Sequence, residues 1–261
     1  MTASYANLIL ETPSPAVARV TVNRPAKMNC LDRATLAELD ACLSALPSGV
    51  RVVVLTGAGP KAFIAGADIA EMSGLSVGEA HAFSQLGHAV LSKLEVMDAV
   101  VIAEVNGYAL GGGCEVMLAC DFAIASDNAR IGQPEVALGV TPGFGGTTRL
   151  LRRVGAARAR QMLYSGEPVT AAQAVELGLV NEVVAPSELR ARVDAIAAKI
   201  LSNGPLAVAA TKRAVRIAAE TDLATANAYE QQAFAMSFAT ADLREGMKAF
   251  LEKRPPEWRG R

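Results

Sequence analysis

The chain has 261 residues, close to the roughly 250–300 residues at which one hydrophobic core stops growing. Hydrophobic residues make up 51% of it, and 25 Lys and Arg against 26 Asp and Glu leave a net charge of −1. This composition predicts one main globular domain with a small appendage. The balanced charge argues against nucleic acid or an anionic membrane surface as a partner.

The chain shows no sign of export, membrane insertion or metal binding. Its apolar stretch 99–105 is too short to span a bilayer and contains Glu104, and its N-terminus lacks a basic segment followed by an apolar one. The cysteines form no C-x-x-C pair and no metal-ligand spacing with His81 or His88; they are Cys30, Cys42, Cys114 and Cys120. We therefore expect a soluble, cytoplasmic protein without a structural metal.

The predicted elements alternate along most of the chain. Apolar or alternating runs predict strands over residues 7–10, 17–23, 50–56, 100–105, 122–125 and 179–184. Helical spacing and capping residues predict helices after Asp32, over 76–97, over 114–120, around Arg149 and over 171–177. Three further helices are predicted over 187–202, 205–220 and 222–253, the last with a break near Thr240. Strands alternate with helices to about residue 185, which indicates an α/β body with a helical tail.

Two segments match motifs of unrelated enzymes in the wrong context. Residues 57–62 fit a relaxed dinucleotide-binding fingerprint, but no second strand ending in an acidic residue follows at the required distance. Residues 74–78 fit the G-x-S-x-G pattern of serine hydrolases, but no strand precedes Ser76, which is better interpreted as a helix cap. Both enzyme classes are therefore weak alternatives.

Three segments have a composition suited to a buried catalytic site. Residues 63–68 place small residues after an apolar run, which lets backbone N–H groups approach a ligand. Residues 106–115 carry three consecutive glycines and then Glu115, at the start of a helix that is apolar on every side. Residues 131–147 surround Glu135 with apolar, glycine and proline residues. A carboxylate in such surroundings needs a partner, a raised pKa, or both.

These segments resemble the enoyl-CoA hydratase/isomerase, or crotonase, superfamily. The resemblance covers nearly the whole chain, in segments at 22–25 with Asn29, 65–68, 106–115, 132–135, 244–246 and 250–254. It implies a right-handed spiral of ββα units, with residues 1–200 as the catalytic core. It also implies that residues 201–261 form a helical region used in trimerisation and in part of the acyl-CoA site. Homotrimers or homohexamers (dimers of trimers) are expected.

The resemblance also implies a mechanism and its residues. The backbone N–H groups of Ala67 and Gly112 would form an oxyanion hole for the thioester carbonyl. Glu115 would help to activate water for addition to C3, and Glu135 would deliver a proton to C2 of a 2-enoyl-CoA. Further substrate contacts are expected at Ala65, Gly66, Asp68, Ile69, Gly111, Pro134 and Gly143. No cofactor is expected, because CoA enters as part of the substrate.

The sequence departs from common family patterns at three positions. Ala70 stands where many members have a lysine, Ile64 is bulkier than usual, and Phe144 lies in the glycine-rich loop near the expected site. These changes affect acyl-chain preference, and we expect a short substrate such as crotonyl-CoA. The alternatives are a Δ3–Δ2-enoyl-CoA isomerase and a non-catalytic acyl-CoA-binding or RNA-binding relative. Retention of both glutamates favours hydration, and Lys93 is the only Lys or Arg of the helix over 76–97, which argues against RNA binding.

Overall fold

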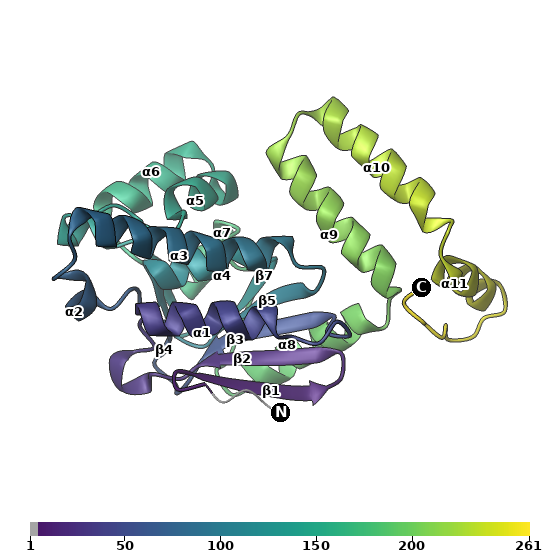
Figure 1. The fold of residues 1–261 in the computed structure, drawn as a ribbon, viewed down its shortest axis with the longest axis horizontal. Coiled ribbons are helices and arrows are strands. Elements are labelled where there is room, and N and C mark those ends of the chain that lie inside the picture. Colours follow the sequence, from purple (N-terminus) through teal and green to yellow (C-terminus); the bar gives the residue numbers. More distant parts are fainter. Residues whose placement is uncertain (1–4) are drawn as a thin grey trace.

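The computed structural model describes residues 5–261, and within them the chain forms two sheets, surrounding helices and a helical tail (Figure 1). The larger sheet has the spatial order β1 (Leu8–Ser14), β2 (Val17–Val22), β3 (Val52–Gly57), β5 (Val100–Val105), β7 (Phe122–Ser126) and β10 (Glu182–Val184). Its β1–β2 pair is antiparallel and its other pairs are parallel. The smaller sheet has the order β4 (Ala62–Ile64), β6 (Tyr108–Leu110), β8 (Arg130–Gly132) and β9 (Val169–Thr170).

The chain visits the two sheets in turn, which produces a repeating ββα path. β3, β5 and β7 of the larger sheet are each followed by a short strand of the smaller one, namely β4, β6 and β8. A helical segment then returns the chain to the larger sheet. The helices of the body are α1 (Arg33–Ser44), α2 (Ile69–Met72), α3 (Val77–Val96), α4 (Gly112–Ala119), α5 (Gly146–Val154), α6 (Ala156–Ser165), α7 (Ala171–Glu176) and α8 (Leu189–Leu201). The expected α/β spiral of ββα units is therefore confirmed.

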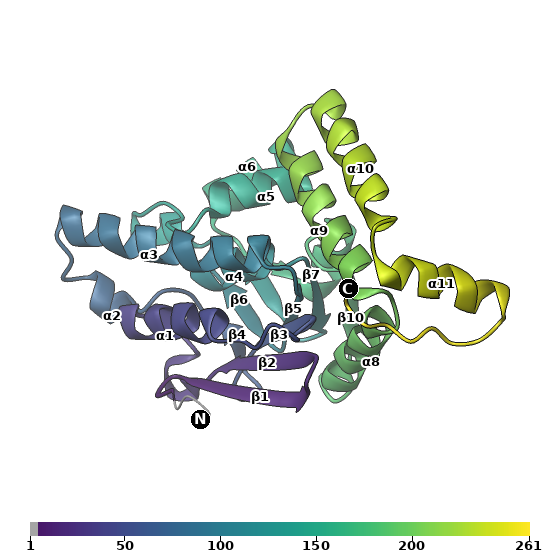
Figure 2. The ribbon, with the colours of Figure 1, turned by 45° about the vertical axis from the view of Figure 1, so that its right-hand side comes forward.

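Helices cover both faces of the larger sheet, so its central strands are buried on both sides. β3 and β5 are buried at every residue, which explains why they appear in the sequence as continuous apolar runs. One face packs with α1, α3 and α4 into the main core, to which Leu36, Leu91 and Met117 contribute. The other face packs against α8 through Val193 and Ala197 (Figure 2).

The tail consists of α9 (Pro205–Glu220), α10 (Leu223–Ser237) and α11 (Ala241–Leu251), which extend away from the body (Figures 1 and 2). The expected break near Thr240 is confirmed, because the Thr240 hydroxyl accepts from the Leu243 N–H and caps α11. In the described chain no single helix has the length and apolar character to cross a membrane. The bent pair α8–α9, with 106° between its members, meets these two criteria together.

Several element boundaries differ from the sequence-based expectations. The expected strand over 179–184 is wrong at its start, since β10 begins at Glu182 while Leu179 and Val180 pack into the core beyond α7. The helix expected over 114–120 begins earlier, at Gly112. The strands of the smaller sheet have two or three residues each, and no hydrophobic period can be detected over so short a length.

A buried ion pair lies between the larger sheet and α8. Arg19 of β2 is 1% exposed, and its guanidinium binds the carboxylate of Glu104 on β5, which is 6% exposed. A second guanidinium nitrogen contacts Asp194 of α8 at 2.6 Å, and this partner is about half exposed. These three side chains therefore connect β2, β5 and α8 on the face of the larger sheet that α8 covers. The loss of one partner from such a buried pair leaves the other charge uncompensated.

We expect Glu104→Ala to lower the free energy of unfolding by about 3–5 kcal/mol, because Arg19 would remain buried without its main partner. The matched change Asp194→Ala removes the exposed partner and should cost about 1 kcal/mol or less. Urea unfolding followed by circular dichroism measures both values. Equal losses in the two variants would contradict the assignment of Glu104 as the principal partner.

Candidate active site

Glu115 lies in the first turn of α4 and is buried, with 1% of its surface exposed. The glycine run before it allows α4 to approach the smaller sheet closely. A Cβ atom on Gly113 would lie 1.8 Å from the carbonyl oxygen of Ile64 in β4, so only glycine fits there. Gly111, which precedes the helix, has φ +50°, a conformation that glycine adopts readily. The local sequence therefore places a carboxylate inside the protein at a helix start.

Two backbone amides hold the Glu115 carboxylate in place. Its Oε1 accepts from the N–H of Phe144 and from the N–H of Gly146, each at 2.7 Å. Burial raises the pKa of Glu115, whereas the two N–H groups and the nearby Arg149 act to lower it. The residues around the carboxylate thus favour its ionised form against the effect of desolvation.

Glu135 begins a short 3₁₀ segment (Glu135–Leu138), which Gln133 and Pro134 separate from β8, and is half-buried. Burial, with a further contribution from the charge of Glu115, raises its pKa to about 7. With its amide nitrogen toward Glu135, the buried Gln133 donates to Oε1 at 2.7 Å and to Oε2 at 3.1 Å. The two glutamates therefore lie close enough to influence each other, and they have different hydrogen-bond partners.

Two backbone N–H groups, those of Ala67 and Gly112, lie near each other and near Glu135. The position of a Cβ atom on Gly112 would be 3.5 Å from the Ala67 nitrogen, and that on Gly111 would be 3.2 Å from Oε1 of Glu135. In the part of the chain that the structure describes, neither the Ala67 N–H nor the Gly112 N–H donates to a protein oxygen. The end of β4 and the start of α4 thus bring together two unpaired donors beside both carboxylates.

The ring of Phe144 forms one wall beside these donors. It is 3% exposed, and its Cε2 would lie 3.3 Å from a Cβ atom on Gly112. The ring fits against Gly87 of α3, where a Cβ atom would come within 2.1 Å of it. It also makes an edge-to-face contact with Phe83, with 5.3 Å between the ring centroids. A bulky, well-fixed side chain therefore limits the space next to the Gly112 amide.

The other expected substrate contacts have different surroundings. Ala65 and Gly66 form the approach to Ala67, and the Gly66 carbonyl accepts from the Leu31 N–H at 2.8 Å. The Asp68 carboxylate contacts Arg24 and Lys27 at 3.1 and 3.0 Å, which lowers its pKa. Its side chain is thus already paired within the protein.

Gly111 lies beside Glu135, and the last three expected contacts, Ile69, Pro134 and Gly143, are less enclosed. Ile69 begins α2 and is 57% exposed. Pro134 immediately precedes Glu135, and Gly143 lies in the loop that donates to Glu115. All three therefore lie on segments next to the carboxylate pair, although the side chain of Ile69 points largely to solvent.

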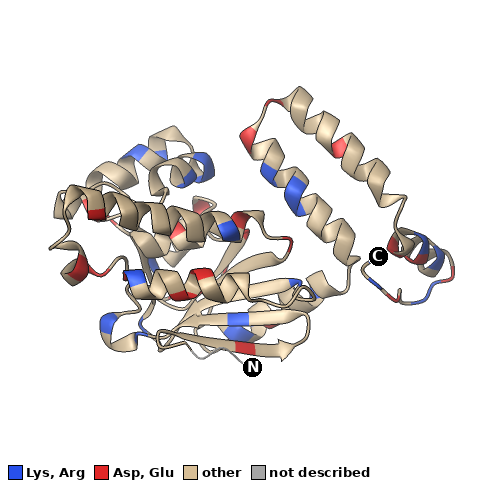
Figure 3. Cartoon of the chain, viewed as in Figure 1, with Lys and Arg blue, Asp and Glu red and all other residues tan. Residues whose placement is uncertain are grey.

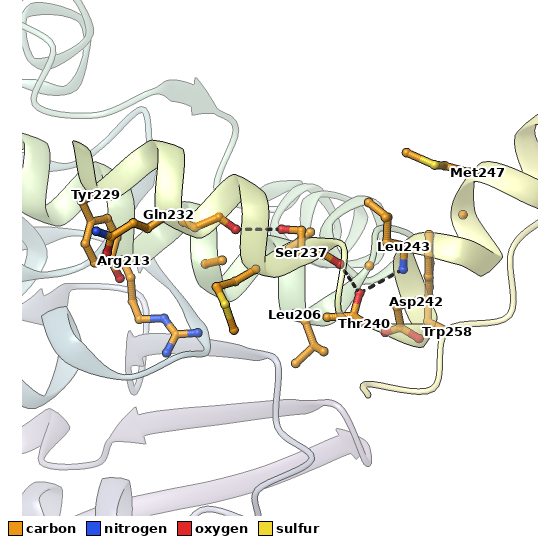
Figure 4. Close-up of a pocket in the computed structure, with 16 residues that line it drawn as sticks. Leu206, Arg213, Tyr229, Gln232, Ser237, Thr240, Asp242, Leu243, Met247 and Trp258 are labelled. Carbon is orange, nitrogen blue, oxygen red and sulfur yellow. Dashed lines mark hydrogen bonds between the residues drawn. The ribbon is translucent and has the colours of Figure 1, made fainter. Parts of the chain in front are cut away.

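A prominent groove, of about 620 Å³, lies elsewhere, between α9, α10 and α11 (Figure 4). Leu206, Tyr229, Leu243 and Trp258 line it, together with Asp242 and Thr240. Neither glutamate is among its lining residues, so it is separate from the chemistry described above. Among residues 5–261, no group of three or more His, Cys, Asp or Glu side chains is placed to hold a metal ion.

Comparison with known proteins identifies the family. The model of the enoyl-CoA hydratase/isomerase family matches residues 12–261. The chain belongs to this family. It is 49% identical to the short-chain-enoyl-CoA hydratase of Clostridium acetobutylicum and 49% identical to the crotonyl-CoA hydratase of Syntrophomonas wolfei. Each alignment covers 96% of this chain and 97% of the relative.

The family is also evident in three dimensions. The crystal structure of an enoyl-CoA hydratase from Bacillus anthracis superposes with a TM-score of 0.95 at 40% identity. The superposition covers 98% of this chain and 100% of the Bacillus anthracis chain. The family resemblance deduced from the motifs is therefore confirmed over the full spiral and the helical tail.

Sequence reasoning missed three residues that support the site. Gln133 was noted only as part of a motif, although its amide orients the Glu135 carboxylate. Arg149 and Glu95 form an ion pair at 2.7 Å beside the loop that holds Glu115. Glu95 and Arg149 are 54 residues apart in the chain, and no local pattern predicts their contact. The only sequence signal for this pair is that Arg149, a basic residue, lies in the first turn of the helix that follows the glycine-rich loop.

Proposed function

We propose that this family member catalyses the reversible addition of water to 2-trans-enoyl-CoA, which gives 3-hydroxyacyl-CoA. The observation that carries the proposal is the placement of two glutamates, one held by amides and one with a pKa raised to about 7, beside two unpaired backbone donors. The names of the relatives from Clostridium acetobutylicum and Syntrophomonas wolfei support hydration of a short enoyl chain. The same enzyme, running in reverse, is a 3-hydroxyacyl-CoA dehydratase.

The thioester oxygen binds between the N–H groups of Ala67 and Gly112. As water adds to C3, the electrons of the C2–C3 double bond move toward this oxygen, and an enolate develops. Donors already in place for that negative charge stabilise the transition state more than the substrate. The approach of α4 to β4, which Gly113 permits, supports this assignment because it brings the two amides together.

The two glutamates divide the proton transfers. Burial raises the pKa of Glu115, and the two N–H groups that bind it favour the ionised form, in which it takes a proton from the attacking water while the new C3–O bond forms. Glu135 is protonated below a pH of about 7 and delivers its proton to C2. Proton exchange with solvent then restores both groups. CoA takes part as a portion of the substrate, and no other cofactor enters this scheme.

The alternatives are less well supported. An isomerase of this fold moves a proton between C2 and C4 and needs one carboxylate, whereas two are present beside the amide pair. An RNA-binding relative needs a basic helix. Lys93 of α3 lies 2.6 Å from Asp40 and is therefore paired within the chain. Hydration uses both glutamates and both backbone N–H groups, and we therefore prefer it to isomerisation and to RNA binding.

We further propose that the protein assembles as a homotrimer or as a dimer of trimers through its tail, and that it acts in the cytoplasm. α10 has no buried residue and carries little charge (Figure 3). Large apolar side chains of the tail are exposed, including Phe250 at 82% and Phe234 at 67%. Further copies of this chain are the natural cover for such a surface. The cysteines are free thiols, which supports a reducing compartment.

The first prediction concerns the carboxylate pair. The wild type should remove the absorbance of the crotonyl-CoA double bond, and Glu115→Gln and Glu135→Gln should each lower kcat by about 10²–10⁴-fold, because each removes a proton-transfer group. A continuous absorbance assay measures this. Near-normal turnover in both variants would refute the assigned mechanism.

The pH profile provides the control for these roles. Glu135 acts as an acid, so kcat/KM should fall as pH rises through the Glu135 pKa of about 7. Glu115 acts as a base, so protonation should reduce activity on the acid side. A profile that keeps rising well above pH 7 would contradict the role of Glu135.

The second prediction concerns chain length. Phe144→Ala should raise the kcat/KM of decenoyl-CoA relative to crotonyl-CoA, because the ring that bounds the space near Gly112 is removed. The change of ratio should be on the order of tenfold or more. Phe83→Leu, which keeps the Phe144 ring, is the matched control. If the wild type already prefers the long substrate, Phe144 does not set the chain length.

The third prediction concerns assembly. Sedimentation should find the wild type as a trimer or hexamer, whereas Phe250→Glu or Phe234→Glu should shift the distribution toward smaller species. A charge at an apolar contact between subunits is left without a partner and costs binding energy. Val77→Glu, at a residue that is 90% exposed on α3, is the control and should leave the assembly unchanged. A monomeric wild type would refute the proposal.

A further inference from the structure

The loop over residues 143–146 contains the Phe144 and Gly146 N–H groups that donate to Glu115. Three successive carbonyl groups of this loop, those of residues 143–145, each accept a hydrogen bond. The peptide unit that ends in the Phe144 N–H begins with the Gly143 carbonyl, which accepts from the Ser84 hydroxyl at 2.5 Å. The unit that ends in the Gly146 N–H begins with the Gly145 carbonyl, which accepts from the Arg149 N–H at 3.0 Å. Because a peptide unit is planar, anchoring its carbonyl also fixes the direction of its N–H.

The third carbonyl, of Phe144, is bound by the Arg149 side chain. Nη1 of Arg149 donates to this oxygen at 2.6 Å. The backbone N–H and the guanidinium of one residue therefore hold two of the three peptide units. The approach is tight, since a Cβ atom on Gly145 would lie 2.2 Å from Nη1, and Gly145 has φ +100°.

The Arg149 guanidinium is itself fixed by α3. Its Nε and Nη2 donate to Oε1 and Oε2 of Glu95 at 2.7 and 2.8 Å. Such a two-point contact sets the plane of the guanidinium as well as its position. The Arg149 side chain is 15% exposed and that of Glu95 is 33% exposed, so water competes little for the arginine.

We propose that Arg149, fixed by Glu95, is a positioning residue for Glu115: it holds the loop so that two N–H groups point at Oε1, and its charge favours the carboxylate form. This inference rests on the proposed role of Glu115 as the base toward water. Arg149 acts through the loop and does not contact the reacting atoms. Consistent with this role, the charge of Arg149 lowers the pKa of Glu115 against the effect of burial.

Other titratable groups near Arg149 bear on its electrostatic role. They include Glu95 and His88 of α3 and Glu115 of α4. Glu95 is the one that pairs with Arg149 directly. Removal of the Arg149 charge should therefore leave the negative charge of Glu95 without its partner, and Glu115 without a positive charge that favours its ionised form.

The test compares Arg149→Gln, Arg149→Lys and Glu95→Gln with Arg152→Gln, an exposed residue of the same helix. Crotonyl-CoA hydration is measured from acid to alkaline pH. Arg149→Gln should lower kcat/KM by about 10²-fold, because a misplaced catalytic group costs about that much. It should also move the acid limb of the profile to higher pH, since protonation of Glu115 becomes easier. Arg149→Lys keeps the charge, so its acid limb should stay near that of the wild type despite a lower rate.

Circular dichroism checks the fold of each variant, and if Arg149→Gln does not fold, Arg149→Lys and Glu95→Gln decide the question. Both should fold and lose at least several-fold in kcat/KM, whereas Arg152→Gln should not. Rates equal to that of Arg152→Gln, or a loss in Arg149→Gln with an unmoved acid limb, would overturn the positioning role and leave the hydratase proposal intact. A wild type without hydratase activity would overturn the proposed function, and this inference with it.

Discussion

The central constraint on this structure is the burial of an ionisable carboxylate, that of Glu115, within an apolar helix. A carboxylate that is 1% exposed is unstable as an anion unless hydrogen bonds replace the lost water. The Phe144 and Gly146 amides provide those bonds at 2.7 Å. The glycine-rich loop must therefore be folded tightly against the start of α4. The contacts from α3 and α5 serve to keep it there.

The ββα path explains how distant segments reach one point. Each pass through the larger sheet ends in a short strand of the smaller sheet, and the connecting segments after β4, β6 and β8 emerge next to one another. These segments carry Ala67, Gly112 and Glu135, respectively. The spiral thus places one residue of the proposed site per turn at the same location, and the larger sheet is packed on both faces. The tail takes no part in this cluster and leaves an apolar surface for other contacts.

Many elements of the fold were predictable because the signals that mark them are local in sequence. α3 and α7 have capping boxes at Ser76 and Thr170 that are local in sequence, and both are present in the structure. β3 and β5 are buried throughout and mostly apolar because both faces of the sheet are covered, and Glu104 of β5 is accommodated by its ion pair with Arg19. The strands of the smaller sheet were not predictable, since hydrogen bonding to distant neighbours, rather than any periodic pattern, makes them strands. The start of β10 at Glu182 depends in the same way on its pairing with β7.

The sequence by itself determined the family, the α/β order of the elements and the candidate residues Glu115, Glu135, Ala67 and Gly112. These depend on short motifs and on local patterns of apolar and glycine residues. Only the tertiary structure decided which groups hold those residues: Gln133 on Glu135, the loop amides on Glu115, and Arg149 with Glu95 behind that loop. Such contacts join side chains and amides up to 54 residues apart. Apart from the contact between Gln133 and Glu135, which are neighbours in the sequence, their geometry depends on how the spiral brings distant segments together, which no local stretch of sequence records.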